Sequence, residues 1–439
     1  MKKTDKQRGI TLIALVITII ILLILAGITI TSLKETGLFT KAQQAKQNTL
    51  EAQLKENTIL DEYTDKIAKY ESVPITNVDT DNTNPEGAKP LGAVVIEGDA
   101  DKGIVIRDTN ENEWVWVEVP KTEVFSKLTI NTDITLTDKN YTDIENKLKE
   151  YTKEYKKDLE GQELNWTDEW YAKDGDNLIT KNTEGLNEAQ KELNNGCGLT
   201  YNQYKELYQK MLKSIYKNGG FWISRYEAGI EGTNTDTTID EIKLIRYLHS
   251  DINNDSPRAV SQVNRIPYNY VYCSEAQKLA SAMSTDSTKT SSLIFGIQWD
   301  LVCKFIETKT ELELKDIKAD STNWGNYKNN SIILTRGKYN IKPNSLDSTW
   351  KNITASTKEQ NAEILTTTGA SEDLKKMNIY DFAGNEWEWT LEKSSDTSKP
   401  CAVRGGSFNH KGIECPAAYR SLDETTNSHS NVGIRSTLY

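Results

Sequence analysis

The chain of 439 residues has few cysteines and histidines, the side chains that hold most zinc and other transition-metal sites. Its five cysteines are an odd number and form no C-x-x-C pair, so the sequence indicates neither a zinc site nor a dense disulfide framework. The three histidines, His249, His410 and His429, leave little material for a His-based metal site or proton relay. A formal net charge of −11, without a basic stripe, argues against nucleic acid as a partner.

One long apolar run stands near the start of the chain. Residues 10–30 carry no charged side chain, and a helix of this length spans roughly 32 Å, which matches a bilayer core. The preceding segment holds Lys2, Lys3, Lys6 and Arg8, so the positive-inside rule leaves the N-terminus in the cytoplasm. We therefore expect a single-pass membrane protein whose bulk is extracytoplasmic, at the cell surface or on a pilus. An uncleaved signal anchor is the simpler alternative.

The residues before this run resemble a type IV prepilin leader. Residues 1–9 are basic and end in Gly9, and I-T-L-I-A-L follows from Ile10. The resemblance implies that a prepilin peptidase cuts between Gly9 and Ile10, and that other pilins are partners. The family usually has Glu at the fifth mature position, where this chain has Ala14. That departure leaves membrane anchoring intact and puts assembly into a fibre in doubt.

The rest of the chain divides by composition. Residues 31–72 have small and apolar side chains mostly three, four or seven apart, which predicts a helical stalk. Residues 73–90 are rich in Asn, Asp, Thr, Pro and Gly and predict a linker. Alternating apolar runs between Gly103 and Pro120 predict a β-hairpin, so a globular domain is expected over 91–439. Within it, 121–218 is polar and periodic, which indicates a helical insertion whose charges form a solvated face.

Seven phrases follow one another in the last 220 residues. They are GFWISRYEAG from Gly220, IPYNYVYCSEAQKLA from Ile266, FGIQWDLV from Phe295, WGN from Trp324, IYDFAGNEWEWT from Ile379, RGGSFN from Arg404 and NVGIRS from Asn431. Together they resemble the formylglycine-generating enzyme, or sulfatase-modifying factor, family, whose domain is a variant of the C-type lectin fold. The expected fold class is therefore α+β: a transmembrane and stalk helix followed by a lectin-like domain with a helical insertion.

The phrase DFAGNEWEW has a chemical interpretation of its own. Asp381 and Glu388 supply hard oxygen donors on either side of a Gly-Asn turn, and Ca²⁺ takes six to eight such oxygens. In the family this segment binds calcium, which implies the side chains of Asp381 and Glu388 and the carbonyls of Gly384 and Glu386 as ligands. Alternatively, Asp381 and Glu388 cap turns and pair with nearby arginines.

Active members of the family oxidise a substrate cysteine with copper(I) held by two cysteine thiolates, soft ligands for a soft ion. Here the first of these positions is His410 and only the second, Cys415, is a cysteine. We expect no oxidase activity from this pair. If the chain is an enzyme after all, His410 and Cys415 are the catalytic residues and Cu⁺ is the cofactor.

The segment 409–431 is long and polar, and loops held by a rigid scaffold are common recognition sites. We expect it to bind an unidentified extracellular ligand. The candidate contact residues are Asn409, His410, Lys411, Tyr419, Ser421, Asp423, Thr425, Asn427 and His429. Related lectin-fold proteins are the variable targets of diversity-generating retroelements, and this composition is compatible with that role. A third possibility is a structural minor pilin at a fibre tip.

Overall fold

The computed structural model describes residues 83–162, 164, 166–167, 196–233, 256–343, 349–354, 356–394, 396, 398–425 and 427–439. The described residues all belong to one compact unit, Val73–Tyr439. The predicted leader, membrane helix and stalk lie outside the described residues. Within the described part, none of the helices is long and apolar enough to cross a membrane.

Folded structure begins inside the predicted linker. Helix α3 (Pro85–Ala88) starts after Asn84, whose side chain accepts a hydrogen bond from the Gly87 N–H at 2.8 Å. Proline at the first helical position and a capping Asn both favour a helix start. Ala88 is fully buried, and the Asn84 N–H donates to the carbonyl of Asn218 at 2.6 Å. The last residues of segment 73–90 therefore belong to the folded unit.

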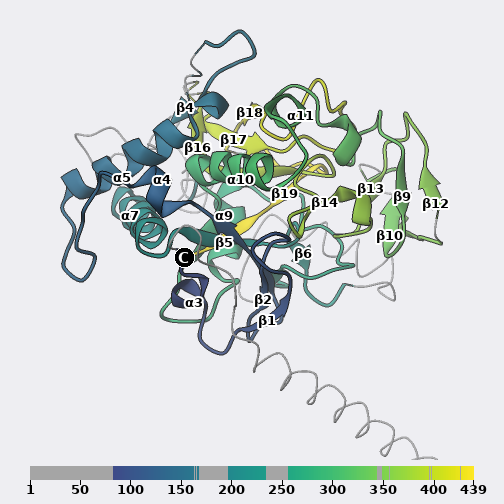
Figure 1. The fold of residues 1–439 in the computed structure, drawn as a ribbon. Helices are drawn as coiled ribbons and strands as arrows, with labels where there is room; N and C mark the ends of the chain where they lie inside the picture. The colour runs from purple at the N-terminus through teal and green to yellow at the C-terminus, as the bar shows by residue number, and fades with distance from the viewer. Residues whose placement is uncertain are drawn as a thin grey trace, which may run out of the picture. The chain divides into compact units, whose positions relative to one another are not determined.

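The larger sheet joins both ends of the folded unit, and all its strand pairs are antiparallel (Figure 1). In spatial order its strands are β1 (Val94–Glu97), β2 (Val105–Arg107), β3 (Glu113–Glu118), β5 (Gly220–Ser224), β20 (Ser436–Leu438) and β8 (Ser291–Leu293). Strands β2 and β3 are the hairpin expected between residues 103 and 120, with Ile106 opposite Trp114. Every residue of β3 and β5 is buried, so the centre of this sheet lies in the core.

The second sheet carries the C-terminal phrases. Its central strand β16 (Trp387–Ser394) pairs antiparallel with β17 (Cys401–Arg404) and parallel with β19 (Val432–Ile434). Strand β18 (Arg420–Asp423) extends the sheet beyond β17, and the short β4 (Trp166–Thr167) pairs with β16. One strand of the predicted insertion is therefore part of the sheet that carries the C-terminal segment.

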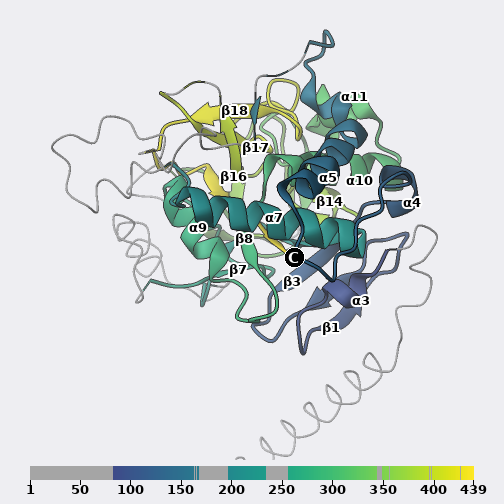
Figure 2. The same cartoon turned by 90° about the vertical axis from the view of Figure 1, so that its left-hand side faces the viewer.

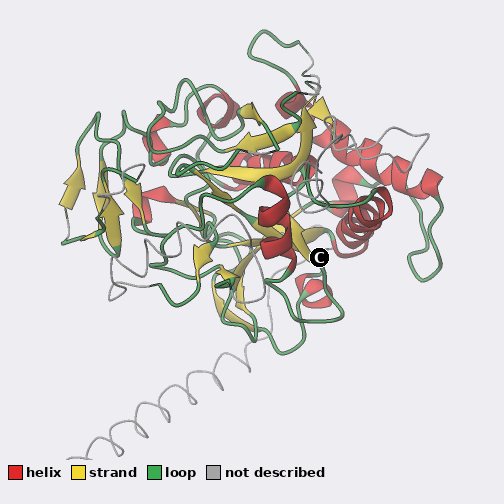
Figure 3. Ribbon diagram, turned by 180° about the vertical axis from the view of Figure 1, so that it is seen from behind, coloured by secondary structure: helices red, strands yellow, loops and turns green. Residues whose placement is uncertain are grey.

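The remaining described strands form small sheets. The pairs and their strands are β6 (Gly229–Ile230) with β7 (Ala259–Val260), β9 (Ile332–Leu334) with β12 (Ser356–Lys358), β10 (Lys338–Asn340) with β11 (Lys351–Asn352) and β13 (Leu365–Thr366), and β14 (Lys375–Lys376) with β15 (Ile379–Tyr380). The sheets built from β9, β10, β12 and β13 lie at one edge of the domain (Figures 1 and 3).

Two helices of the predicted insertion lie against each other, α5 (Asp138–Tyr151) and α7 (Tyr201–Asn218), as Figures 1 and 2 show. Each begins with a capping box, from Thr137 and from Thr200, and α7 ends at Gly219 in the left-handed conformation. Such caps satisfy the free N–H and C=O groups at helix ends. The remaining helical segments are α4 (Lys121–Val124), η1 (Lys153–Lys156), α9 (Cys273–Ser281), α10 (Gly296–Lys309), α11 (Leu314–Lys318), η2 (Thr322–Trp324) and η3 (Glu372–Leu374).

Helix α10 is the most deeply buried of the described helices, with ten buried positions between Gly296 and Ile306. It contacts β3 of the larger sheet and β16 of the second sheet, so it lies between the two. The fully buried indole rings of Trp114, Trp222, Trp299 and Trp389 fill the same core. Large aromatic side chains bury the most apolar area per residue, which stabilises this arrangement.

Candidate ligand-binding site

The turn after β17 sets the geometry of the C-terminal segment. Gly405 and Gly406 have φ of 95° and 77°, a left-handed region that favours glycine. A Cβ atom at Gly406 would lie 2.4 Å from the carbonyl oxygen of Cys415 and 2.6 Å from the Tyr327 ring. The Tyr327 hydroxyl donates to the carbonyl of Gly405 at 2.7 Å. Both glycines are therefore required by backbone conformation, and Gly406 also by close packing.

Beneath this turn lies a buried ionic network that the sequence did not reveal. Arg404 donates to Glu392 at 2.8 Å and to Asp300 at 2.9 Å, and all three side chains are fully buried. Arg420 donates to the same two carboxylates, at 2.8 Å to Glu392 and 2.6 Å to Asp300. The Lys156 ammonium lies 3.4 Å from both. Arg404 and Arg420 thus hold the two ends of the segment between β17 and β18.

Lys156 and Tyr155 correct one expectation about the insertion. Its charges were expected to form a solvated face, but the Lys156 side chain is only 14% exposed and reaches the buried network. The Tyr155 ring is buried, and its carbonyl accepts from Arg420 at 2.7 Å. These contacts join residues more than 140 positions apart, which a periodicity argument along the insertion alone does not detect.

Arg435, in the last of the seven phrases, is fully buried. Its Nε donates to both oxygens of Glu388, at 2.9 and 2.8 Å, and its Nη2 lies 2.7 Å from Glu388 Oε1. It also donates to the carbonyls of Ser224 and Tyr380. One guanidinium therefore links three of the phrases, and its role here is architectural.

The segment expected to bind calcium is part of a buried acidic cluster. Asp381, Glu386 and Glu388 are joined by Glu227, a residue that the sequence did not single out. Burial raises the pKa of each: to about 6 for Asp381, and to about 7 for Glu388 against the opposing effect of Arg435. Glu227 accepts from the Asn385 side chain at 2.6 Å and from the Glu386 N–H at 3.0 Å.

The side chains of this acidic cluster suit a cation only in part. Glu388 is committed to Arg435, as in the alternative raised from the sequence. Asp381 Oδ1 and Glu386 Oε2 are buried acceptors that have no hydrogen-bond partner among the described residues. Gly384 has φ of 75° and its N–H donates to the Gly405 carbonyl at 2.8 Å. Among the described residues, no three His, Cys, Asp or Glu side chains are grouped to hold a metal ion. Calcium binding stays a prediction.

The two residues at the family's copper positions lie in different surroundings. His410 is half-buried; its Nδ1 lies 2.8 Å from Ser407 Oγ, and burial lowers its pKa. Cys415 is 8% exposed, and burial raises the pKa of its thiol to about 12. Copper and zinc bind the thiolate rather than the thiol. His410 and Cys415 therefore do not form the pair of thiolates with which the family binds copper.

The candidate contact residues fall into two groups. Tyr419 and His429 are exposed, whereas Asn409, His410, Lys411, Ser421, Asp423 and Asn427 are half-buried. Thr425 is 2% exposed, so it faces the interior and does not present a contact surface. Ser421 and Asp423 belong to strand β18 rather than to a loop. Sequence alternation could have indicated this strand, but the polar composition concealed it.

Two local contacts organise the exposed members. Asp423 accepts from the Asn427 side chain at 2.6 Å and lies 3.3 Å from His429 Nε2. Trp387 meets the His410 ring edge-on at 5.4 Å and the Tyr419 ring at 6.0 Å. His410, Trp387 and Tyr419 therefore form an aromatic group, of which Tyr419 is 44% exposed. The Lys411 ammonium pairs with Glu414 at 2.7 Å.

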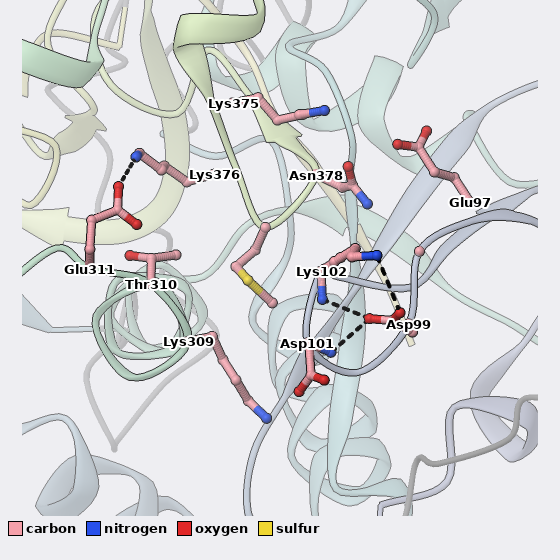
Figure 4. Close-up of a pocket in the computed structure, with 12 residues that line it drawn as sticks. Glu97, Asp99, Asp101, Lys102, Lys309, Thr310, Glu311, Lys375, Lys376 and Asn378 are labelled. Atoms are coloured by element: carbon pink, nitrogen blue, oxygen red, sulfur yellow. Dashed lines mark hydrogen bonds and ion pairs between the residues drawn. The ribbon is translucent and has the colours of Figure 1, made fainter.

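A separate cavity of about 650 Å³ lies between the β1–β2 connection, the end of α10 and the β14–β15 turn. Figure 4 shows its charged lining, with Lys376 reaching Glu311 and Lys102 lying close to Asp99. Lys309 and Lys375 pair with Glu118 and Glu372. Because each lysine has an acidic partner, this cavity has no excess of either charge, and no predicted residue lies in it.

These features define a mixed α/β domain in which glycine turns and buried arginines fix the C-terminal segment. A model of the sulfatase-modifying factor enzyme 1-like domain matches residues 219–438, half of the chain, and the chain belongs to this family. The family inferred from the seven phrases is thereby confirmed.

Two solved structures are similar to the chain at low sequence identity. The crystal structure of CarF matches 50% of this chain and 85% of its own, with 12% identity and a TM-score of 0.26. Treponema denticola variable protein 1 matches 60% of this chain and 77% of its own, with 16% identity and a TM-score of 0.19. No curated protein matches the chain.

Proposed function

We propose that this chain is a pilin-like cell-surface protein, anchored by residues 10–30, whose C-terminal segment binds an extracellular ligand. The observation that carries the binding role is the aromatic group of His410, Trp387 and Tyr419. Tyr419 is the exposed ring of this group, at 44%, and it packs on Trp387, which is 5% exposed. An exposed aromatic side chain held by a packed scaffold is typical of recognition surfaces. Residues 405–419, which include His410 and Tyr419, are held at both ends because Arg404 and Arg420 pair with buried carboxylates.

The alternative, a copper oxidase, has less support from the residues present. The family mechanism requires two cysteine thiolates, and the first position is His410, held against Ser407. A panel of extracellular polysaccharides and matrix proteins, probed with the full-length chain in detergent, tests the binding role. Binding should fall at least about tenfold with Tyr419→Ala, the usual size for an aromatic contact residue. The matched control, Ile341→Ala, changes a residue 48% exposed that lies far along the chain and should bind normally.

Equal binding by the Tyr419→Ala variant and the wild-type chain would contradict the binding role. Formation of formylglycine in a cysteine peptide, lost with Cys415→Ser, would instead establish the oxidase. A fibre-tip role is tested separately by co-purification with pili. Sequence variation concentrated at residues 409–431 among close relatives would support the retroelement interpretation.

The membrane anchor is tested by N-terminal sequencing of the mature chain and by protease treatment of intact cells. We expect a mature chain that begins at Ile10 and a Gly9→Val variant that stays uncleaved. We also expect residues 83–439 to be digested from outside. A chain recovered in the cytoplasmic fraction with an intact N-terminus would overturn this part of the proposal.

A further inference from the structure

A second cavity, of about 260 Å³, lies beside the aromatic group. One of its walls is the segment after η1, including Leu159 and Leu164, and the other is the C-terminal segment around Ile413 and Tyr419. Lys318, at the end of α11, completes the lining. The first wall lies outside residues 219–438, which match the family model, so the pocket joins the family domain to a segment that precedes it.

The rim of the pocket is unusually apolar for an exposed surface. Leu159 is 66% exposed, Ile413 is 61% exposed and Tyr419 is 44% exposed. Single exposed apolar side chains are common, but their gathering around one hollow indicates a binding surface. These three belong to the few large apolar side chains that the described residues expose, and they come from segments about 250 positions apart.

The walls are held together by hydrogen bonds, so the pocket is formed before any ligand arrives. The Ala418 N–H donates to the Ile317 carbonyl at 3.0 Å, which fixes the C-terminal segment to α11. Arg420 donates to the Tyr155 carbonyl at 2.7 Å, which fixes it to the insertion. A preformed pocket reduces the ordering cost of binding.

The charges around the pocket favour an anion at one place. Among the described residues, Lys318 forms no ion pair within 4 Å. Burial lowers its pKa, the more distant carboxylates of Glu154 and Asp158 oppose this shift, and the cations Lys157 and Arg420 add to it. The acids on the rim are engaged or peripheral: Glu414 pairs with Lys411, Asp158 accepts from the Gln162 N–H, and Glu160 stands on an exposed turn. An anion next to Lys318 would therefore supply a missing partner for a partly desolvated ammonium.

We propose that this pocket binds an apolar carboxylate, with its hydrocarbon body against Leu159, Ile413 and Tyr419 and its carboxylate on Lys318. The inference rests on the proposed binding function and assigns it a place and a ligand class. Two sources share this chemistry: a small aromatic or aliphatic acid, and the C-terminal residue of a peptide that ends in a large apolar side chain.

Isothermal titration of the full-length chain in nanodiscs tests the assignment with four probes. They are 3-phenylpropanoate, its amide, the peptide Gly-Ser-Gly-Phe with a free C-terminus, and the same peptide amidated. We expect at least one carboxylate probe to bind about tenfold or more tightly than its amide, as a charged hydrogen bond requires. Lys318→Met keeps the apolar stem and should remove this preference. Lys315→Met is the matched control on the same helix, since its side chain is 70% exposed and outside the pocket.

The outcomes separate the possibilities. Binding of the free acid alone assigns a small-molecule ligand, and binding of the peptide acid alone assigns a peptide C-terminus. Equal affinity for acid and amide, or an unchanged preference in Lys318→Met, would overturn the role of Lys318. If no probe binds while Tyr419→Ala still abolishes binding in the extracellular panel, the pocket assignment fails and the proposed function stands.

Discussion

Removing Arg404 is the perturbation that tests the structural account most directly. Its guanidinium is fully buried, bridges Asp300 and Glu392, and lies 5.4 Å from the Trp299 ring. Arg404→Met keeps most of the side-chain volume but leaves two buried carboxylates with less compensating charge. Breaking a buried ion pair by removing one partner costs about 3–5 kcal/mol. Because folded proteins are stable by about 5–15 kcal/mol, this loss is a large fraction of the total.

Urea unfolding of the full-length chain in mild detergent, followed by tryptophan fluorescence, measures the effect. The buried rings of Trp299 and Trp389 report on the core around the network. Arg258→Met is the matched control, because its pair with Glu231 is exposed and 3.8 Å long, and such surface pairs contribute about 0–1 kcal/mol. Arg404→Lys should recover only part of the loss, since an ammonium cannot bridge two carboxylates as a planar guanidinium does.

The same network predicts the acid limit of stability. Burial opposes ionisation of Glu392, but Arg420, Arg404 and Lys156 together hold its pKa below the usual range. Because the pKa of Glu392 is lower in the folded state than in the unfolded state, where it is about 4.3, the ionised carboxylate stabilises the fold above about pH 4.3. This stabilisation is lost as the pH falls from there through the folded-state pKa. Loss of stability on acidification should therefore be smaller in a Glu392→Gln variant.

For the arginine variants, the refuting result is a small difference. If the unfolding free energies of Arg404→Met and Arg258→Met lie within about 1 kcal/mol of each other, the buried network does not stabilise the fold as argued.

Three further predictions concern the C-terminal half. The hydrogen bond to Asp423 raises the pKa of His429, although partial burial opposes this shift. The pair therefore stabilises the fold fully below about pH 6.5 and less as the pH rises through the raised pKa. Asp423→Asn should lower the pKa of His429 in an NMR titration, and an unchanged pKa would contradict the pairing. Burial keeps the Cys415 thiol protonated at pH 8, so iodoacetamide should label it slowly until the chain is unfolded, whereas fast native labelling would show an exposed thiolate. If the free acceptors of Asp381 and Glu386 bind Ca²⁺, a chelator should lower the melting temperature of the wild-type chain but not that of the Asp381→Asn variant. An unchanged melting temperature of the wild-type chain would refute calcium binding at this site.

The sequence predicted those parts of the fold whose signals are local. Alternation between Gly103 and Pro120 identified the hairpin of β2 and β3, because side chains of a strand alternate between two faces. The RGGSFN phrase contains Gly405 and Gly406, and both have a positive φ, which glycine adopts more readily than other residues. In each case the evidence lies within a few residues, and long-range packing agrees with it.

The buried charges could not be predicted in the same way. Asp300 and Glu392 look like ordinary polar positions in a helix and a strand, and nothing near them in sequence shows that two arginines cover them. Glu227 was missed for a similar reason, because its acidic neighbours are more than 150 positions away. Burial of a charge is decided by its partners, and these partners meet only after both sheets have formed.

This distribution of charge also bears on how the C-terminal segment can vary. Arg404 and Arg420 flank residues 405–419, and both are fixed by the carboxylates of α10 and β16 rather than by residues between them. The side chains of Lys411, Ile413 and Tyr419 lie between these fixed ends and are partly or fully exposed. Substitutions at exposed positions usually change stability by less than about 0.5 kcal/mol. Substitutions at the exposed positions of this segment are therefore compatible with a fold that the buried network keeps unchanged, which is what a variable binding surface, as proposed, requires.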